Sequence, residues 1–179
     1  MPLQDDEKKN LHDKLRHIEA VVMDVDGTMT DGAMYFGANG EVMKRFSVRD
    51  GMGITLLQRA GIRTAIVTSE NSPIVISRAA KLKIERVVLG SRNKKRAIIE
   101  LSEQLGTILG NIAYIGDDVN DADPMRLCGV SACPSDAVAT IRDIADFICT
   151  SEGGKGAVRE FAEAILIAQG KSITLPESW

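Results

Sequence analysis

The chain has 179 residues, enough for one globular domain with a small appendage, and its net charge of -3 favours neither a nucleic acid nor an anionic membrane as partner. Hydrophobic residues make up 44% of the sequence, yet no segment approaches the ~18 apolar residues of a membrane span, and the charged N-terminus is unlike a signal peptide. The three cysteines show no CxxC spacing, so we expect reduced thiols and a cytoplasmic protein.

Three parts are expected along the chain: a charged N-terminal helix or extension over 1–17, a main domain over 18–170 and a C-terminal tail over 171–179. In the main domain, short β-branched runs alternate with longer segments of helical period. This alternation is typical of an α/β fold in which helices flank a parallel sheet. The expected strands are 20–25, 64–68, 86–89, 111–115, 130–133 and 147–149.

Helices are expected between these strands. In the segment DGMGITLLQRAG, residues 50–61, Asp50 is suited to cap the start of a helix and Gly61 to end it in a left-handed conformation. The other expected helices are 73–82, 94–105, 136–146 and 156–169.

One segment breaks the alternation. Residues 33–46, AMYFGANGEVMKRF, have two short strand-like arms around Asn39-Gly40, a dipeptide that favours a type I′ turn. We therefore expect a β-hairpin inserted after the first strand. An isolated hairpin is marginally stable in water, so a partner subunit is expected to cover its apolar side chains, which are Met34, Tyr35, Phe36, Val42, Met43 and Phe46.

Carboxylates follow the ends of two expected strands, where open α/β sheets bind their ligands. The first strand runs into MDVDGTMTDG, residues 23–32, in which Asp24 and Asp26 are two apart and project the same way from an extended chain. The fourth strand runs into GDDVND, which contains Asp117. Carboxylates this close repel one another, and Mg²⁺, which prefers oxygen ligands, removes that repulsion. The sequence therefore predicts a Mg²⁺ site.

A phosphate group fits beside such a metal. The hydroxyl of Thr68 and neighbouring backbone NH groups are suited to hold phosphate oxygens, and Lys94 to neutralise a phosphate or an anionic nucleophile, with Lys95 as its rival. Each motif alone is more often a turn, a helix cap or a solvated surface. Their order on successive strand ends favours a functional site.

The ordered set DxDGT, Thr, Lys and GDDxxD resembles the haloacid dehalogenase superfamily, whose members have a Rossmann-like fold. The resemblance implies that Asp24 attacks phosphorus and forms an aspartyl-phosphate. It also implies that Asp26 is the general acid and then the base for water, and meets Mg²⁺ through its backbone carbonyl. The remaining implied roles are phosphate binding for Thr68, charge neutralisation for Lys94 and metal binding for Asp117.

Over about residues 18–170 the chain is similar to one branch of that superfamily, which lacks a large cap domain. This branch contains phosphatases of 3-deoxy-D-manno-octulosonate 8-phosphate, enzymes of lipopolysaccharide biosynthesis. Its members are tetramers whose hairpins assemble between subunits, which implies a homotetramer and a role for EGGKG, residues 152–156, as a mobile lid. The implied sugar-phosphate pocket contains Val48, Arg49, Asp50, Gly51, Thr55 and Arg78.

The segment after the second strand departs from the pattern of the octulosonate enzymes. It reads Thr68-Ser69-Glu70 where they have Thr-Gly-Arg, and Lys81 follows Glu70 by eleven residues, as in the related phosphatases of nine-carbon keto-sugar acids. We therefore add Ser69, Glu70 and Lys81 to the substrate-binding residues. The expected function is Mg²⁺-dependent hydrolysis of the terminal phosphate of the eight-carbon acid, with 2-keto-3-deoxynononate 9-phosphate as the alternative substrate. A noncatalytic oligomeric module is a further alternative, disfavoured because all three metal-site aspartates are present.

Overall fold

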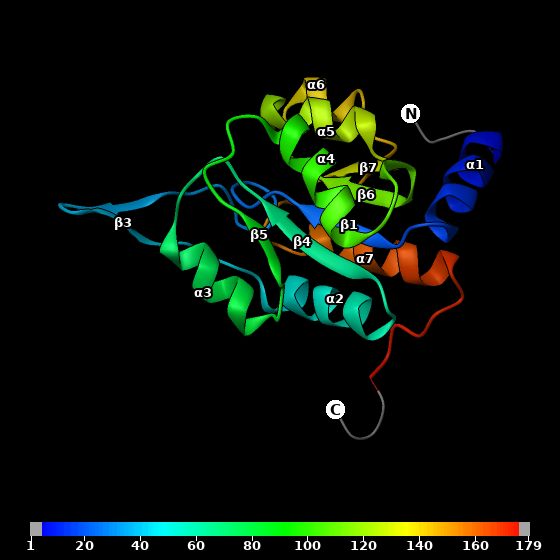
Figure 1. Ribbon diagram of the computed structural model, residues 1–179, viewed down its shortest axis with the longest axis horizontal. Coiled ribbons are helices and arrows are strands. Elements are labelled where there is room, and N and C mark those ends of the chain that lie inside the picture. Colours follow the sequence, from blue (N-terminus) through cyan, green and yellow to red (C-terminus); the bar gives the residue numbers. More distant parts are fainter. Residues whose placement is uncertain (1–4, 176–179) are drawn as a thin grey trace.

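The computed structural model describes residues 5–175. Six parallel strands form one sheet in the order β5-β4-β1-β6-β7-β8, and a two-stranded hairpin, β2-β3, projects from the body of the molecule (Figure 1). All six expected strands are present, so the α/β class is confirmed. The strands are β1 Ala20–Met23, β4 Arg63–Val67, β5 Arg86–Val88, β6 Ile112–Ile115, β7 Val130–Cys133 and β8 Phe147–Ile148.

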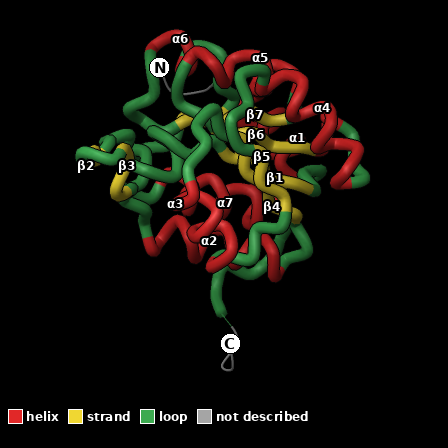
Figure 2. Tube along the Cα trace, turned by 60° about the vertical axis from the view of Figure 1, so that its left-hand side comes forward, coloured by secondary structure: helices red, strands yellow, loops and turns green. Residues whose placement is uncertain are grey.

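Helices cover both faces of the sheet, as Figure 2 shows. The described helices are α1 Asp5–Arg16, α2 Val48–Arg59, α3 Pro73–Lys81, α4 Lys94–Leu105, α5 Ala122–Leu127, α6 Ala139–Arg142 and α7 Ala157–Ala168. Among them, no helix has the length and apolar character that crossing a membrane requires. Residues 1–4 of the predicted N-terminal extension and 176–179 of the predicted tail lie outside the described part.

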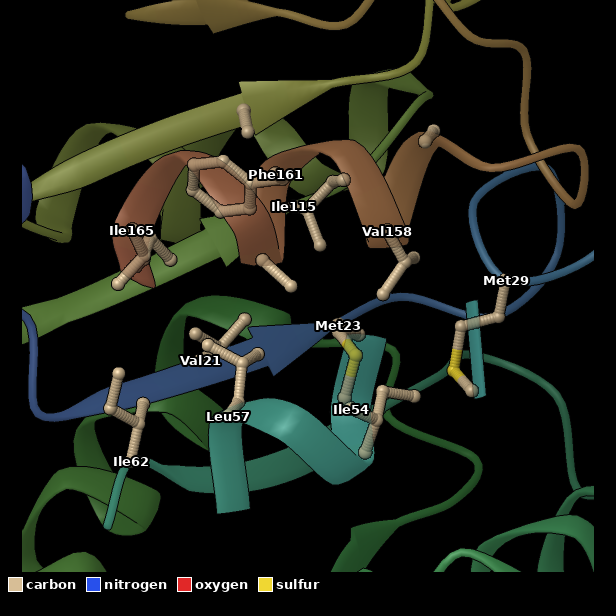
Figure 3. Packing of buried hydrophobic residues seen from close by; sticks show 14 of the residues in the cluster. Val21, Met23, Met29, Ile54, Leu57, Ile62, Ile115, Val158, Phe161 and Ile165 are labelled. Atoms are coloured by element: carbon tan, nitrogen blue, oxygen red, sulfur yellow. The ribbon is translucent and has the colours of Figure 1, made fainter. Parts of the chain in front are cut away.

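The core has two halves, one on each face of the sheet. Val21 and Met23 of β1 point to one face, where they pack with residues of α2 and α7 such as Leu57 and Phe161 (Figure 3). The alternate residues of β1 point to the other face and pack under α4 and α5. Because β1 is buried on both faces, it fixes the loop that follows its carboxyl end.

Two helix predictions are wrong in detail. Ser47, not Asp50, caps α2, and its hydroxyl accepts a hydrogen bond from the Asp50 backbone N at 3.3 Å, while Gly61 does have the left-handed φ of +82°. The helix expected over 136–146 shrinks to α6. The helix ends early because the chain turns toward β8. Asp146, directly before β8, is fixed beside β7, since its carboxylate accepts a hydrogen bond from the Ser131 backbone N at 2.8 Å. The helix α5 was not expected.

The hairpin is present, but its turn differs from the prediction. β2 Tyr35–Gly37 pairs with β3 Gly40–Met43, and Gly37 stands opposite Gly40, so the loop is Ala38-Asn39. A type I′ turn at Asn39-Gly40 needs a positive φ at both residues. Within residues 5–175, Lys83 is the one non-glycine residue with a positive φ, so that turn type is excluded. Phe36 and Val42 are 64% and 62% exposed, and their cover by a partner stays a prediction.

Candidate active site

The strand order places the predicted motifs side by side. β1 lies between β4 and β6, so the loops leaving their carboxyl ends meet at one edge of the sheet. Asp24 directly follows β1, Thr68 directly follows β4, and Asp117 follows β6 by two residues. Lys94, the first residue of α4, reaches the same place, while its rival Lys95 points to solvent. The structure thus brings the four predicted motifs to one edge.

The Lys94 ammonium lies between two carboxylates. Its Nζ donates to Asp24 Oδ1 and to Asp121 Oδ1, both at 2.6 Å, and all three side chains are buried. Burial opposes the charged form of Lys94, but the neighbouring charges of Asp24 and Asp121 outweigh it and raise its pKa. The lysine therefore stays a fixed cation against the first aspartate of DxDGT.

Three carboxylates meet in this centre. One oxygen from each of Asp24, Asp117 and Asp121 lies within 4.8 Å of the others, and Thr28 donates its hydroxyl hydrogen to Asp117 Oδ1 at 2.9 Å. Burial, helped by the charge of Asp121, raises the pKa of Asp117 to about 6, and burial also raises the pKa of Asp24. A divalent cation offsets the cost of burying charged carboxylates and removes their mutual repulsion. These hard oxygen donors therefore fit such an ion.

The assignment from the sequence missed Asp121 as a part of this centre. The carboxylate accepts hydrogen bonds from Lys94 and from the Tyr114 hydroxyl, the latter at 2.6 Å, and from the backbone N of Asp117 at 3.1 Å. It therefore both orients the lysine and shapes the loop that carries Asp117. One sequence feature could have indicated this role: Asp121 ends the motif GDDVND, four residues after Asp117. At that spacing its side chain can fold back on the loop that carries Asp117.

The Asp26 side chain points to a different partner. Its Oδ1 accepts a hydrogen bond from Lys44 Nζ at 2.5 Å, and Lys44 also forms an ion pair with Glu41 at 2.6 Å. Lys44 comes from the hairpin and is buried. The assignment from the sequence missed it, although it is the one lysine in a segment of otherwise mainly apolar side chains.

The predicted pocket residues on α2 fall into two groups. Val48 and Arg49 are exposed at the start of the helix. Asp50 is buried and accepts a hydrogen bond from the Arg159 backbone N at 2.9 Å, and the Thr55 hydroxyl donates to the Gly51 carbonyl at 3.0 Å. These two side chains are therefore engaged within the chain.

Arg78 of α3 reaches across to the start of α2. It donates from Nη2 to the Ser47 carbonyl at 2.9 Å, lies over the Phe46 ring at 5.4 Å and would meet a Cβ placed on Gly51 at 2.7 Å. A side chain at position 51 would therefore displace the end of the arginine, which links the starts of the two helices.

The three residues that bear on the choice between the two substrates do not lie together. The Ser69 hydroxyl donates to the Ser91 carbonyl at 3.1 Å and accepts from Asn120 Nδ2 at 3.2 Å, so it joins three loops of the site edge. Glu70 is exposed directly beyond, whereas Lys81 is exposed in the last turn of α3, eleven residues further. Within the described chain no ion pair joins Glu70 to Lys81.

The glycine-rich segment 152–156 packs on its own chain. The backbone N of Gly153 donates to Asp136 Oδ1 at 2.9 Å and that of Gly154 to the Thr28 carbonyl at 3.0 Å. A Cβ on Gly153 would come within 1.8 Å of the Gly27 carbonyl oxygen. The segment therefore buttresses the loop that carries the aspartates, and its role as a mobile lid stays a prediction.

A cleft of about 410 Å³ opens between the glycine-rich segment and the start of α2. Its lining includes three cations, Arg45, Arg49 and Lys155. Of these, Arg45 also donates to Asp31 Oδ2 at 3.1 Å, and Lys155 forms an ion pair with Glu152. The cleft therefore carries positive charge close to the loop that follows β1, which suits an anionic ligand.

Residues 62–161 match the haloacid dehalogenase-like hydrolase family, and a relative described below is 42% identical, so the chain belongs to this family, as its motifs predicted. The 3-deoxy-D-manno-octulosonate 8-phosphate phosphatase of Haemophilus influenzae is 42% identical over 162 residues, which cover 90% of each chain. The cobalt-bound structure of that species' phosphatase superposes with a TM-score of 0.87 at 43% identity, covering 89% of this chain and 93% of the other.

A second solved structure adds a ligand-bound relative. The 3-deoxy-D-manno-octulosonate 8-phosphate phosphatase of Moraxella catarrhalis, in complex with a magnesium ion, a phosphate ion and a KDO molecule, superposes with a TM-score of 0.88 at 38% identity. The match covers 90% of this chain and 93% of that one. The fold is therefore shared over nearly the whole length of both chains.

Proposed function

We propose that this chain is a Mg²⁺-dependent phosphomonoesterase that removes the terminal phosphate from a 3-deoxy-2-keto sugar acid, foremost 3-deoxy-D-manno-octulosonate 8-phosphate. The observation that carries the proposal is the buried Asp24, paired with Lys94 and grouped with Asp117 at the carboxyl edge of the sheet. The similarity to the Haemophilus influenzae and Moraxella catarrhalis phosphatases over nearly the whole chain supports the substrate class.

The proposed chemistry assigns the two aspartates of DxDGT to different tasks. Asp24 attacks phosphorus and forms an aspartyl-phosphate, while Asp26 gives a proton to the departing sugar hydroxyl and later takes one from the attacking water. Lys94 neutralises the developing negative charge, and Thr68 with nearby backbone NH groups holds phosphate oxygens. Asp24, Asp117 and the Asp26 backbone carbonyl would hold the Mg²⁺, which supplies charge neutralisation to the phosphate when bound.

The basic cleft provides a place for the rest of the substrate. A 3-deoxy-2-keto sugar acid carries a carboxylate in addition to its phosphate, and Arg49, Arg45 and Lys155 present positive charge in one cleft. The exposed apolar side chains of the hairpin support assembly through this element, and we include a homotetramer in the proposal.

The eight-carbon and nine-carbon substrates are distinguished by turnover. We expect kcat/KM to be at least about tenfold higher for 3-deoxy-D-manno-octulosonate 8-phosphate, because the similarity to the phosphatases of that ester covers nearly the whole chain, whereas Glu70 and Lys81 are exposed and form no ion pair among the described residues. Measuring phosphate release from both substrates, with wild type and Glu70→Arg, tests this. A higher kcat/KM for the nine-carbon ester in the wild type, lost in Glu70→Arg, would favour the alternative substrate. Absence of phosphate release from either would contradict the proposed function.

The metal site is tested without turnover. We expect saturating Mg²⁺ to raise the midpoint of thermal unfolding by roughly 5 °C or more, since a ligand at about 100 times its Kd adds about 2.7 kcal/mol of stability. In Asp117→Asn the increase should nearly vanish, because one of the two carboxylates proposed to hold the ion is lost. The exposed neighbour gives the matched control: Asp118→Asn should keep the wild-type increase. Equal increases in both variants would remove Asp117 from the site.

A further inference from the structure

Lys44 is a buried cation that the proposed chemistry has not used. Its side chain is 1% exposed, and its Nζ lies 2.5 Å from Asp26 Oδ1 and 2.6 Å from Glu41 Oε1. Removing a charge from water costs several kcal/mol unless close partners compensate, and here two carboxylates do so. The lysine is therefore fixed in place, with its ammonium engaged by Asp26 and Glu41.

A second bond ties the same group to the core domain. Glu41 Oε2 accepts a hydrogen bond from the Ser72 hydroxyl at 2.6 Å, and Ser72 is buried at the start of α3, just beyond the end of β4. The chain Ser72, Glu41, Lys44 and Asp26 thus runs from the loop after β4, through Glu41 of β3 and Lys44 directly after that strand, to the loop after β1. The base of the hairpin is held against the catalytic edge from two sides.

The two oxygens of the Asp26 carboxyl are in different situations. Oδ1 is occupied by Lys44, whereas Oδ2 is buried and receives no hydrogen bond from the described residues. A carboxyl group rotates about its Cβ–Cγ bond unless one oxygen is fixed, because that terminal torsion is broad. Fixing Oδ1 therefore fixes the direction in which Oδ2 points.

We infer that Lys44 is a positioning residue for proton transfer: by holding Oδ1, it aims Oδ2 of Asp26 at the ester oxygen of the substrate. This inference rests on the proposed function. In the first step, Oδ2–H gives its proton to the ester oxygen as the bond between that oxygen and phosphorus breaks. In the second step, the resulting carboxylate takes a proton from the water whose oxygen attacks the aspartyl-phosphate. The hairpin is then part of the catalytic machinery as well as a surface element.

The dependence on the leaving group tests this inference. A sugar alkoxide needs a proton to leave, whereas p-nitrophenolate leaves without one, and kcat/KM reports the steps up to departure of the leaving group. For Lys44→Met we expect kcat/KM to fall by about 30-fold or more with the sugar-acid phosphate and by less than about threefold with p-nitrophenyl phosphate. Lys44→Arg, which keeps a cation, should recover part of the loss.

Two further variants keep the test decisive. Lys83→Met removes an exposed lysine far from the carboxyl edge and should leave both kcat/KM values unchanged. Lys44→Met leaves Asp26 and Glu41 without their cation; adding Glu41→Gln removes the charge of the more buried of these two carboxylates, so it keeps the test available if the single variant unfolds, and it should show the same unequal losses. Equal losses on the two esters, or no loss on either, would overturn the inference while leaving the proposed function intact. Failure of the wild type to cleave any phosphate ester would overturn both.

Discussion

Asp24→Asn is expected to lower kcat for phosphate release by at least about 10⁴-fold, because an amide does not attack phosphorus to form the phosphoryl-enzyme. The fold should persist: the residue directly follows β1, which is buried on both faces, and Lys94 keeps its second partner, Asp121, at 2.6 Å. Steady-state assays with saturating Mg²⁺ measure the loss, and far-ultraviolet circular dichroism checks the fold.

A matched substitution controls for the loss of a carboxylate as such. Asp123→Asn changes an exposed aspartate of α5 whose contact with Arg126, at 4.0 Å, is a weak surface pair, and it should leave kcat within about twofold of wild type. Mass spectrometry of the quenched reaction gives a second readout, since a phosphorylated peptide containing Asp24 should appear in wild type. Undiminished turnover in Asp24→Asn would contradict the aspartyl-phosphate mechanism.

The part of the site that was predictable follows from backbone geometry. Asp24, Thr68 and Asp117 come directly or almost directly after strands, and the carboxyl ends of neighbouring parallel strands meet at one edge. Strand recognition alone was therefore enough to group them. The roles of Lys44 and Asp121 depend instead on which side chains point into the site. The local sequence pattern does not indicate that a lysine of the hairpin contacts Asp26.

Two errors in the helix prediction have a common cause, since distant contacts overrode local preference. The helical period over 136–146 yields to the bonds between Asp146 and Ser131, which lie fifteen residues apart and bring the chain to β8. Asp50 has the chemistry of a helix cap, yet its carboxylate accepts a hydrogen bond from the Arg159 backbone N at the start of α7, 109 residues away. A stretch of sequence as long as one helix contains neither Ser131 nor Arg159, so the local pattern did not reveal these contacts.

The contact between the glycine-rich segment and the loop after β1 predicts a second large effect. Gly153→Ala is expected to lower the free energy of unfolding by about 3 kcal/mol or more, because overpacking a filled site forces the backbone to move. A Cβ there would lie 1.8 Å from the Gly27 carbonyl oxygen and 3.0 Å from that of Thr30. Neither side yields easily, since the Gly153 and Gly154 backbone N atoms are bonded to Asp136 and Thr28.

The same substitution should lower kcat by about tenfold or more, because the displaced loop carries Asp24 and Asp26, and misplacement of reacting groups by about 1 Å can cost 100-fold. Urea unfolding and steady-state assays measure the two effects on one preparation. Gly110→Ala is the control: a Cβ there meets nothing nearer than 3.8 Å, so stability should stay within about 1 kcal/mol of wild type. A Gly153→Ala protein as stable and active as that control would show that the segment does not support the catalytic loop.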